Sequence, residues 1–119
     1  MPTIRKFCLL IMAFSLLSCQ DTGTARFIVK NKSSSLIDSL FFRPSDTISR
    51  QYIKLEPGEE QKYNLPMTGL RTDGAYSINF RKRLEKISQV FGYFSNGMSM
   101  EKYTEIEIME DTILFTPEY

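Results

Sequence analysis

Short segments in which apolar and polar residues alternate dominate this chain after its first twenty residues, and they constrain its fold more than any other feature. The clearest segment, 75–81, places Tyr76, Ile78 and Phe80 at every second position. A period of two puts alternate side chains on opposite faces of a β-strand, so this segment is predicted to be a half-buried strand. Turn residues separate it from similar segments on either side, which is typical of an all-β domain.

Seven or eight strands are expected, in the segments 26–30, 36–42, 51–55, 60–65, 75–81, 90–94, 98–109 and 112–116. The first two are expected to pair, as a hairpin or a Greek-key step. Residues 82–89 are left open between one helical turn and an irregular loop, because Leu84 and Ile87 are three positions apart. With no long helix expected, the pattern predicts an antiparallel β-sandwich, immunoglobulin-like or transthyretin-like, or a small barrel.

Two turn signals support this prediction. Glu56-Pro57-Gly58-Glu59 combines a residue with fixed φ and one that is free to take positive φ. Asn96-Gly97 is the strongest short hairpin signal, because a type I′ turn needs positive φ at two successive residues.

The first residues have a different character. Arg5 and Lys6 precede a run from Phe7 to Leu17 in which only Ser15 is polar. This is the build of a secretory signal, and the run is too short for a spanning helix, which needs about 20 apolar residues. A helix is expected near residues 4–17.

Leu16-Leu17-Ser18-Cys19 ends this run and resembles the lipobox of bacterial lipoproteins. The resemblance implies cleavage between Ser18 and Cys19, a diacylglyceryl thioether on Cys19 and, usually, acylation of the new amine. Two or three acyl chains on one residue make a stable anchor, whereas one chain binds reversibly. The expected parts are therefore a signal peptide (1–18), a lipidated tether (19–25) and a β-sandwich domain (26–119).

Gln20 follows the cysteine. In the similar lipoproteins of enterobacteria, an Asp at this position resembles a signal for retention in the inner membrane, and this chain has no such Asp. The resemblance therefore favours the outer membrane, with its periplasmic and surface faces both open. The chain as a whole resembles the small lipoproteins of Bacteroidota that join a lipobox to an uncharacterised β-sandwich.

Several function classes are excluded or disfavoured. Loss of residues 1–18 lowers Lys+Arg from 15 to 13 against 14 acidic residues, and this net charge of −1 argues against nucleic acid as a partner. The chain has no His, and its two cysteines, Cys8 and Cys19, lie in or beside the signal. No calcium-loop spacing, serine-nucleophile motif or cofactor motif is present, so we expect no enzyme, no metal and no cofactor.

The candidate ligand surface is the aromatic segment before the Asn-Gly turn. Alternation predicts Phe91 and Tyr93 on one face and Phe94 on the other, with Tyr93, Phe94 and Asn96 as possible contacts for a sugar. Packing in the core is the more common role of such aromatics. A basic cluster, Arg81-Lys82-Arg83 with Lys86, is expected either to contact anionic headgroups or lipopolysaccharide phosphates or to be a solvated loop, which is the more common role of such clusters.

The function expected from these features is a non-enzymatic binding or assembly module of the cell envelope, held on the membrane by lipid on Cys19. Its partners would be envelope proteins or glycans. A glycan-binding surface lipoprotein and an accessory lipoprotein of a secretion or efflux apparatus are the alternatives.

Overall fold

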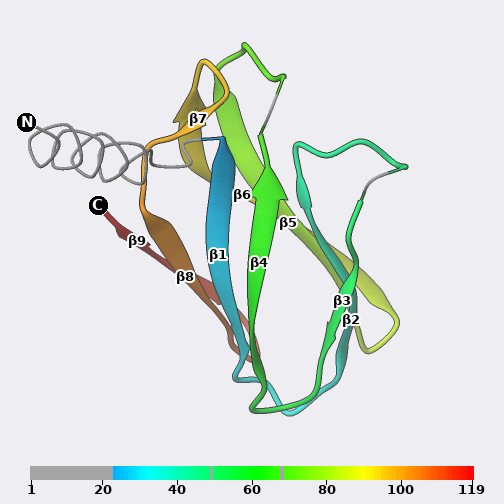
Figure 1. The fold of residues 1–119 in the computed structure, drawn as a ribbon. Helices are drawn as coiled ribbons and strands as arrows, with labels where there is room; N and C mark the ends of the chain where they lie inside the picture. Colours follow the sequence, from blue (N-terminus) through cyan, green and yellow to red (C-terminus); the bar gives the residue numbers. More distant parts are fainter. Residues whose placement is uncertain (1–22, 49, 68) are drawn as a thin grey trace, which may run out of the picture.

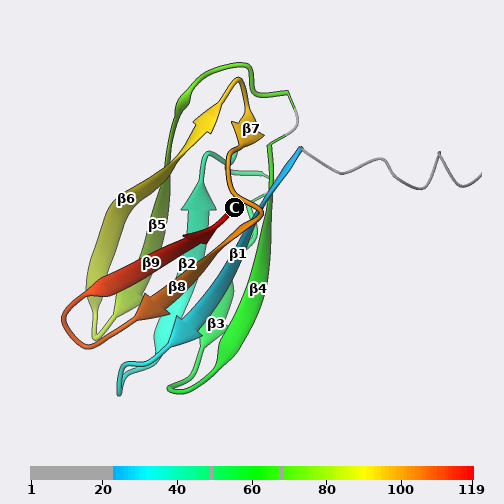
Figure 2. The same cartoon turned by 90° about the vertical axis from the view of Figure 1, so that its left-hand side faces the viewer.

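The computed structural model describes residues 23–48, 50–67 and 69–119, which form two β-sheets packed face to face (Figures 1 and 2). The expected β-sandwich is therefore confirmed. Its strands are β1 (Thr24–Asn31), β2 (Ile37–Arg43), β3 (Ile53–Leu55), β4 (Glu60–Pro66), β5 (Gly74–Lys82), β6 (Glu85–Ser95), β7 (Met98–Ser99), β8 (Tyr103–Ile108) and β9 (Ile113–Glu118).

One sheet has the strand order β4-β1-β8-β9 and the other β3-β2-β5-β6-β7. Neighbouring strands are antiparallel except β1 and β8, which run parallel with Phe27 opposite Thr104. In an immunoglobulin constant domain the first strand lies beside the second, in the order ABED. Here it lies between the fourth and eighth strands, so the order differs from that of an immunoglobulin constant domain.

The prediction that the first two strands pair is wrong, because β1 and β2 belong to opposite sheets. They meet face to face instead: the rings of Phe27 and Phe42 stack with centroids 4.3 Å apart. Alternation gave each strand one apolar face, and two such faces bury more apolar area against each other than two strand edges do.

An aromatic cluster fills the space between the sheets. Tyr76 and Phe91 approach the ring of Phe27 edge-on, at 5.2 and 5.4 Å, and Tyr63 approaches Phe42 in the same way at 4.8 Å. Each such side chain stabilises a fold by roughly 1.5–3 kcal/mol when it is fully buried. This packing holds together a domain whose described residues include no cysteine.

Residues 82–89 form neither a helical turn nor an irregular loop. They contain the tight turn of the β5–β6 hairpin, in which Lys82 pairs with Glu85. Arg83 and Leu84 occupy the turn with φ of 51° and 67°, the left-handed values of a type I′ turn. Sequence reasoning missed this hairpin because neither residue is a Gly or Asn.

The strand expected at 98–109 is two strands. β7 pairs with β6 through the Asn96-Gly97 turn, as the hairpin signal predicts, and then β8 joins the other sheet. The chain crosses between the sheets at residues 100–102.

The domain begins two residues before the expected boundary. β1 starts at Thr24, Ala25 is fully buried, and the Gly23 carbonyl accepts a hydrogen bond from the Met67 amide at 2.8 Å. The expected signal helix, the cleavage site at Ser18 and the lipidation site at Cys19 lie outside the described residues.

Candidate functional site

The structure separates the three residues of the expected ligand surface. Tyr93 is half exposed and Asn96 is exposed, but Phe94 is buried at 5% exposure. The ring of Phe94 packs 5.3 Å from that of Tyr76. Phe94 therefore belongs to the core, and the proposed three-residue contact does not exist as predicted.

A β-bulge is the cause. Gly92 takes a φ of 64°, and the register between β5 and β6 shifts between the pairs Tyr76–Phe91 and Gly74–Phe94. The extra residue in β6 turns both Phe91 and Phe94 inward and leaves Tyr93 outside. The prediction that Phe91 and Tyr93 share a face is accordingly wrong.

A different surface concentrates charge, on the outer face of the five-stranded sheet. Strand alternation turns Leu40, Phe42 and Phe80 inward, so their neighbours point outward. We call this surface the cationic face. It comprises two aromatic residues, Phe41 and Tyr52, and five basic ones, Arg43, Arg50, Lys54, Arg81 and Lys86.

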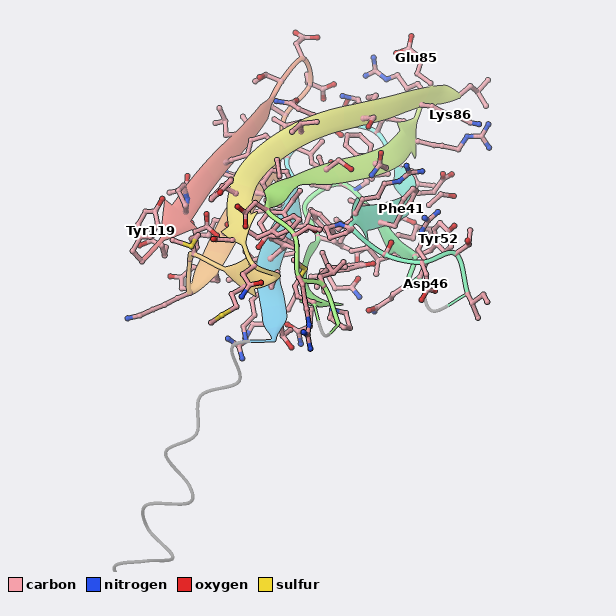
Figure 3. All side chains as sticks on the ribbon, turned by 90° about the horizontal axis from the view of Figure 1, so that it is seen from above. Phe41, Asp46, Tyr52, Glu85, Lys86 and Tyr119 are labelled. Carbon is pink, nitrogen blue, oxygen red and sulfur yellow. The ribbon has the colours of Figure 1, made fainter. Side chains whose placement is uncertain are left out.

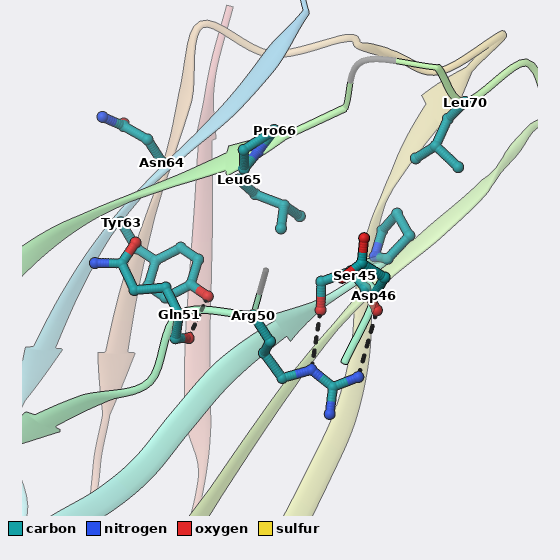
Figure 4. A pocket seen from close by; sticks show the side chains of 10 residues that line it. Ser45, Asp46, Arg50, Gln51, Tyr63, Asn64, Leu65, Pro66 and Leu70 are labelled. Carbon is teal, nitrogen blue, oxygen red and sulfur yellow. Dashed lines mark hydrogen bonds between the residues drawn. The ribbon is translucent and has the colours of Figure 1, made fainter. Parts of the chain in front are cut away.

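Arg50 is the best positioned of these cations. The carbon of its guanidinium group lies 4.2 Å from the centroid of the Phe41 ring, a cation–π contact. Its Nε donates to the Ser45 hydroxyl at 3.2 Å and one terminal nitrogen to the Ser45 carbonyl at 3.3 Å (Figure 4). The Tyr52 ring lies edge-on to Phe41 at 5.3 Å and is 53% exposed. The structure therefore holds a guanidinium group and an exposed phenol ring against the same side chain, Phe41.

A shallow groove of about 340 Å³ runs along this face, and Arg43, Arg81 and Lys86 line it together with both aromatic residues. Figure 3 shows Phe41, Tyr52 and Lys86 from above. Polar side chains also contribute: Ser88 donates to Asn79 Oδ1 at 2.7 Å, in the row of residues opposite Phe41. Amide and hydroxyl groups of this kind exchange hydrogen bonds with a polar ligand.

The two outer faces treat charge differently. On the four-stranded sheet Lys30 lies between Glu60 and Glu107, so that opposite charges are neighbours. On the cationic face Arg81 lies between Lys86 and Asp38, whose Oδ1 is buried without a hydrogen-bond partner. Among the described residues, no ion pair joins the five basic residues of the cationic face to an acid. Like charges opposite each other destabilise a sheet, and a bound anion would relieve that repulsion.

The expected basic cluster is divided between two roles. Arg81 and Lys86 remain on the cationic face, but Lys82 points into the protein, where its Nζ donates to the carbonyls of Met109 and Glu110 at 3.2 and 2.6 Å. Arg83 pairs with the Glu110 carboxylate at 3.2 Å.

Glu110, which forms the ion pair with Arg83, has an exposed side chain. Hydrogen bonds from the hydroxyl and the amide of Ser34, with a smaller contribution from Arg83, hold the pKa of its carboxyl below the usual value. Glu110 is therefore ionised at neutral pH, and it ties the β5–β6 turn to the β1–β2 loop.

A larger cleft, of about 530 Å³, lies beside the cationic face between the β2–β3 loop and the end of β4 (Figure 4). Arg50 and Tyr63 line it, and the Tyr63 hydroxyl donates to the Gln51 carbonyl at 2.6 Å. Burial raises the pKa of this phenol, although the nearby Arg50 charge opposes that effect. Arg50 thus stands between the cleft and the groove.

Sequence reasoning missed Phe41, Arg50 and Tyr52 because they come from three consecutive but distinct segments. The available signal was the alternation at the end of segment 36–42, which puts Phe41 on the outer face when Phe42 is buried. The position of Arg50 in a loop carried no periodic signal.

No protein-family model matches this chain, and no curated protein matches it. Within the described residues, no helix has the length and apolar character to cross a membrane, and no group of three or more His, Cys, Asp and Glu residues is placed to hold a metal ion.

Proposed function

We propose that this chain is a lipid-anchored, non-enzymatic binding module of the cell envelope, and that it captures acidic glycans on the cationic face. The observation that carries the proposal is that Arg43, Arg81 and Lys86, which no ion pair among the described residues engages, surround one groove together with Phe41 and Tyr52. The lipobox ending at Cys19 supports the location.

The chemistry of the face suits such a ligand. Guanidinium groups form paired, charge-assisted hydrogen bonds with carboxylate, sulfate or phosphate groups, and Arg50 is already oriented by Phe41 and Ser45. The exposed Tyr52 ring offers an apolar surface for the C–H face of a sugar ring. Asn79 and Ser88 would bind hydroxyl groups. Neutral glycans would use the aromatic and amide contacts but none of the cations.

The test is binding of the processed chain to a polyuronate, with a neutral dextran of the same length as the comparison ligand. The double variant Arg43→Gln/Arg81→Gln removes two charges from the groove. Its matched control, Arg26→Gln/Lys62→Gln, removes two from the outer face of the four-stranded sheet. We expect at least a tenfold loss of affinity in the first variant, about 1.4 kcal/mol, and an unchanged affinity in the control.

Tyr52→Ala should weaken binding at every salt concentration, whereas the effect of the charge variant should shrink as salt screens it. Tyr93→Ala tests the surface expected from the sequence and should have no effect. Equal losses in both double variants would show attraction to net charge alone and would refute the proposal. So would binding to anionic phospholipid vesicles without binding to the polyuronate.

The anchor needs its own measurement, because Cys19 lies outside the described residues. In a bacterium that processes lipoproteins, the wild-type chain should have the mass of residues 19–119 plus acyl groups and should fractionate with membranes. Cys19→Ala should remain uncut and unacylated. An unacylated wild-type product would contradict the proposed location.

A further inference from the structure

We infer that the end of the sandwich at which β1 begins lies against the lipid bilayer and inserts exposed methionine and tyrosine side chains into its interface. This inference rests on the proposed lipid anchor. It adds a second contact with the membrane and fixes how the domain stands on it.

Exposed large apolar side chains gather at this end. Met98 and Met100 are 45% and 55% exposed, Tyr93 is 50% exposed and Tyr119 is 78% exposed. We call these four residues the terminal patch. Methionine adapts its shape to soft apolar surroundings, and tyrosine favours the boundary between acyl chains and water, so both residue types suit a bilayer interface.

Strand pairing places the patch beside the start of β1. β7 follows the hairpin turn at the end of β6, and residue 100 lies between β7 and β8, whose parallel register with β1 puts both strand starts at the same end. The Lys102 amide donates to the Glu118 carbonyl at 2.8 Å, which brings the C-terminal residue to this end (Figure 1).

The length of chain between the proposed anchor and the domain leaves little freedom. Five residues, from Cys19 to Gly23, span at most about 17 Å even when fully extended. The opposite end of the sandwich, at the Arg83-Leu84 turn, is separated from this one by the nine residues of β5, about 30 Å. The terminal patch is therefore the part of the domain that reaches the headgroups first.

Basic side chains at this end can contact headgroups, beside an exposed acid, Glu118, which lies opposite Tyr103 at the start of β8. Two acids are already engaged within the protein: Asp73 accepts a hydrogen bond from the Asn96 amide at 2.7 Å, and Glu101 accepts one from the Ser99 hydroxyl at 3.3 Å. Arg71 and Lys102 are exposed, and no ion pair occupies either of them among the residues described. Long basic side chains can direct their charge to phosphate groups while their carbon chains cover apolar surface.

This orientation has a consequence for the cationic face. Its groove lies on the outer face of the five-stranded sheet, across β2, β5 and β6, so a domain standing on the terminal patch would present the groove sideways, clear of the bilayer. A long acidic glycan could then pass along the membrane and contact the groove from the side.

The absence of tryptophan from the chain makes the test direct, because one introduced Trp reports without background. Met100→Trp places the probe in the terminal patch. Leu84→Trp is the matched control, since Leu84 is 95% exposed at the opposite end. The lipidated, processed chain would be reconstituted in phosphatidylcholine vesicles with and without brominated acyl chains. We expect at least twofold quenching and a blue shift for Met100→Trp, and neither for Leu84→Trp.

Flotation of the vesicles is scored first. A processed chain that fails to float overturns the anchor and, with it, this inference. A chain that floats but shows equal quenching at both positions, or none at Met100→Trp, overturns the docking alone and leaves the anchor standing. The double variant Met98→Ser/Met100→Ser, in a chain with Tyr119→Trp as the probe, should restore emission typical of water; unchanged quenching would also overturn the docking.

Discussion

A fully buried asparagine should be the most sensitive polar position in this domain. Asn31 ends β1, and its Nδ2 donates to the carbonyls of Ser35 and Leu55 at 2.8 and 3.0 Å. Its Oδ1 accepts from the amide and the hydroxyl of Ser33 at 3.0 and 2.7 Å. One side chain thus joins the end of β1, the following loop and the end of β3, which lies in the opposite sheet.

Asn31→Ala removes all four hydrogen bonds. At about 1 kcal/mol net for each, the free energy of unfolding should fall by about 4 kcal/mol, out of the roughly 5–15 kcal/mol typical of a domain. In urea denaturation with an m-value of about 1.3 kcal/mol/M, the midpoint should fall by about 3 M. Asn64→Ala is the matched control, because Asn64 is exposed on β4, and it should shift the free energy by less than about 0.5 kcal/mol.

Asn31→Asp separates hydrogen bonding from side-chain size. The new carboxylate would face the carbonyls of Ser35 and Leu55, so its pKa in the folded state should rise above the unfolded value of about 3.9. A raised folded pKa means that stability is lost as the pH increases. The destabilisation should therefore be larger at pH 7 than at pH 4. A cost under about 1 kcal/mol for Asn31→Ala, or no pH dependence for Asn31→Asp, would refute this account of the network.

Three further predictions concern turns and buried polar groups. Gly97→Ala should destabilise the domain by at least about 3 kcal/mol, because a Cβ would lie 2.0 Å from the Leu70 carbonyl oxygen. Gly58→Ala is the comparison and should lower the free energy of unfolding by about 1 kcal/mol, since it meets only the conformational penalty at a φ of 86°. Similar losses of stability for the two variants in thermal denaturation would contradict this. Lys82→Met should destabilise by about 2–3 kcal/mol, because two turn carbonyls lose a charged donor, and an unchanged urea midpoint would contradict it. Burial raises the pKa of Tyr63, so the stability present at neutral pH should decrease as the pH rises above about 10. Tyr63→Phe should lose less stability over that range, which urea denaturation at a series of pH values would show.

The strands could be predicted from the sequence wherever the residues themselves encode local geometry. The alternation of apolar and polar residues predicted the buried side chains of β5, and Asn96-Gly97 predicted the turn between β6 and β7. Arg83 and Leu84 adopt the same positive φ values without the residue types that favour them, so the surrounding hairpin, and not the turn sequence, sets their conformation.

Other features depend on contacts between distant residues. The parallel pairing of β1 with β8 joins residues more than seventy positions apart, and no local pattern encodes it. The bulge at Gly92 reversed the expected direction of Phe94, because one extra residue shifts every later side chain to the other face. The candidate site shares this dependence: Arg50 becomes a positioned cation only when folding brings Phe41 beneath it.

The placement of charge links the sequence to the proposed binding. A processed chain with a net charge of −1 gives no sign of affinity for anions. Strand order changes this, because Lys30 lies between two acids on one sheet while Arg81 and Lys86 lie side by side on the other. Opposite neighbours stabilise the first sheet, whereas the Arg81–Lys86 pair costs stability in the second, where Asp38 is the other neighbour of Arg81. The cationic face therefore has a positive local potential that the net charge of the whole chain does not reveal. An anionic ligand bound there would reduce the repulsion between Arg81 and Lys86, and this gain would add to its affinity.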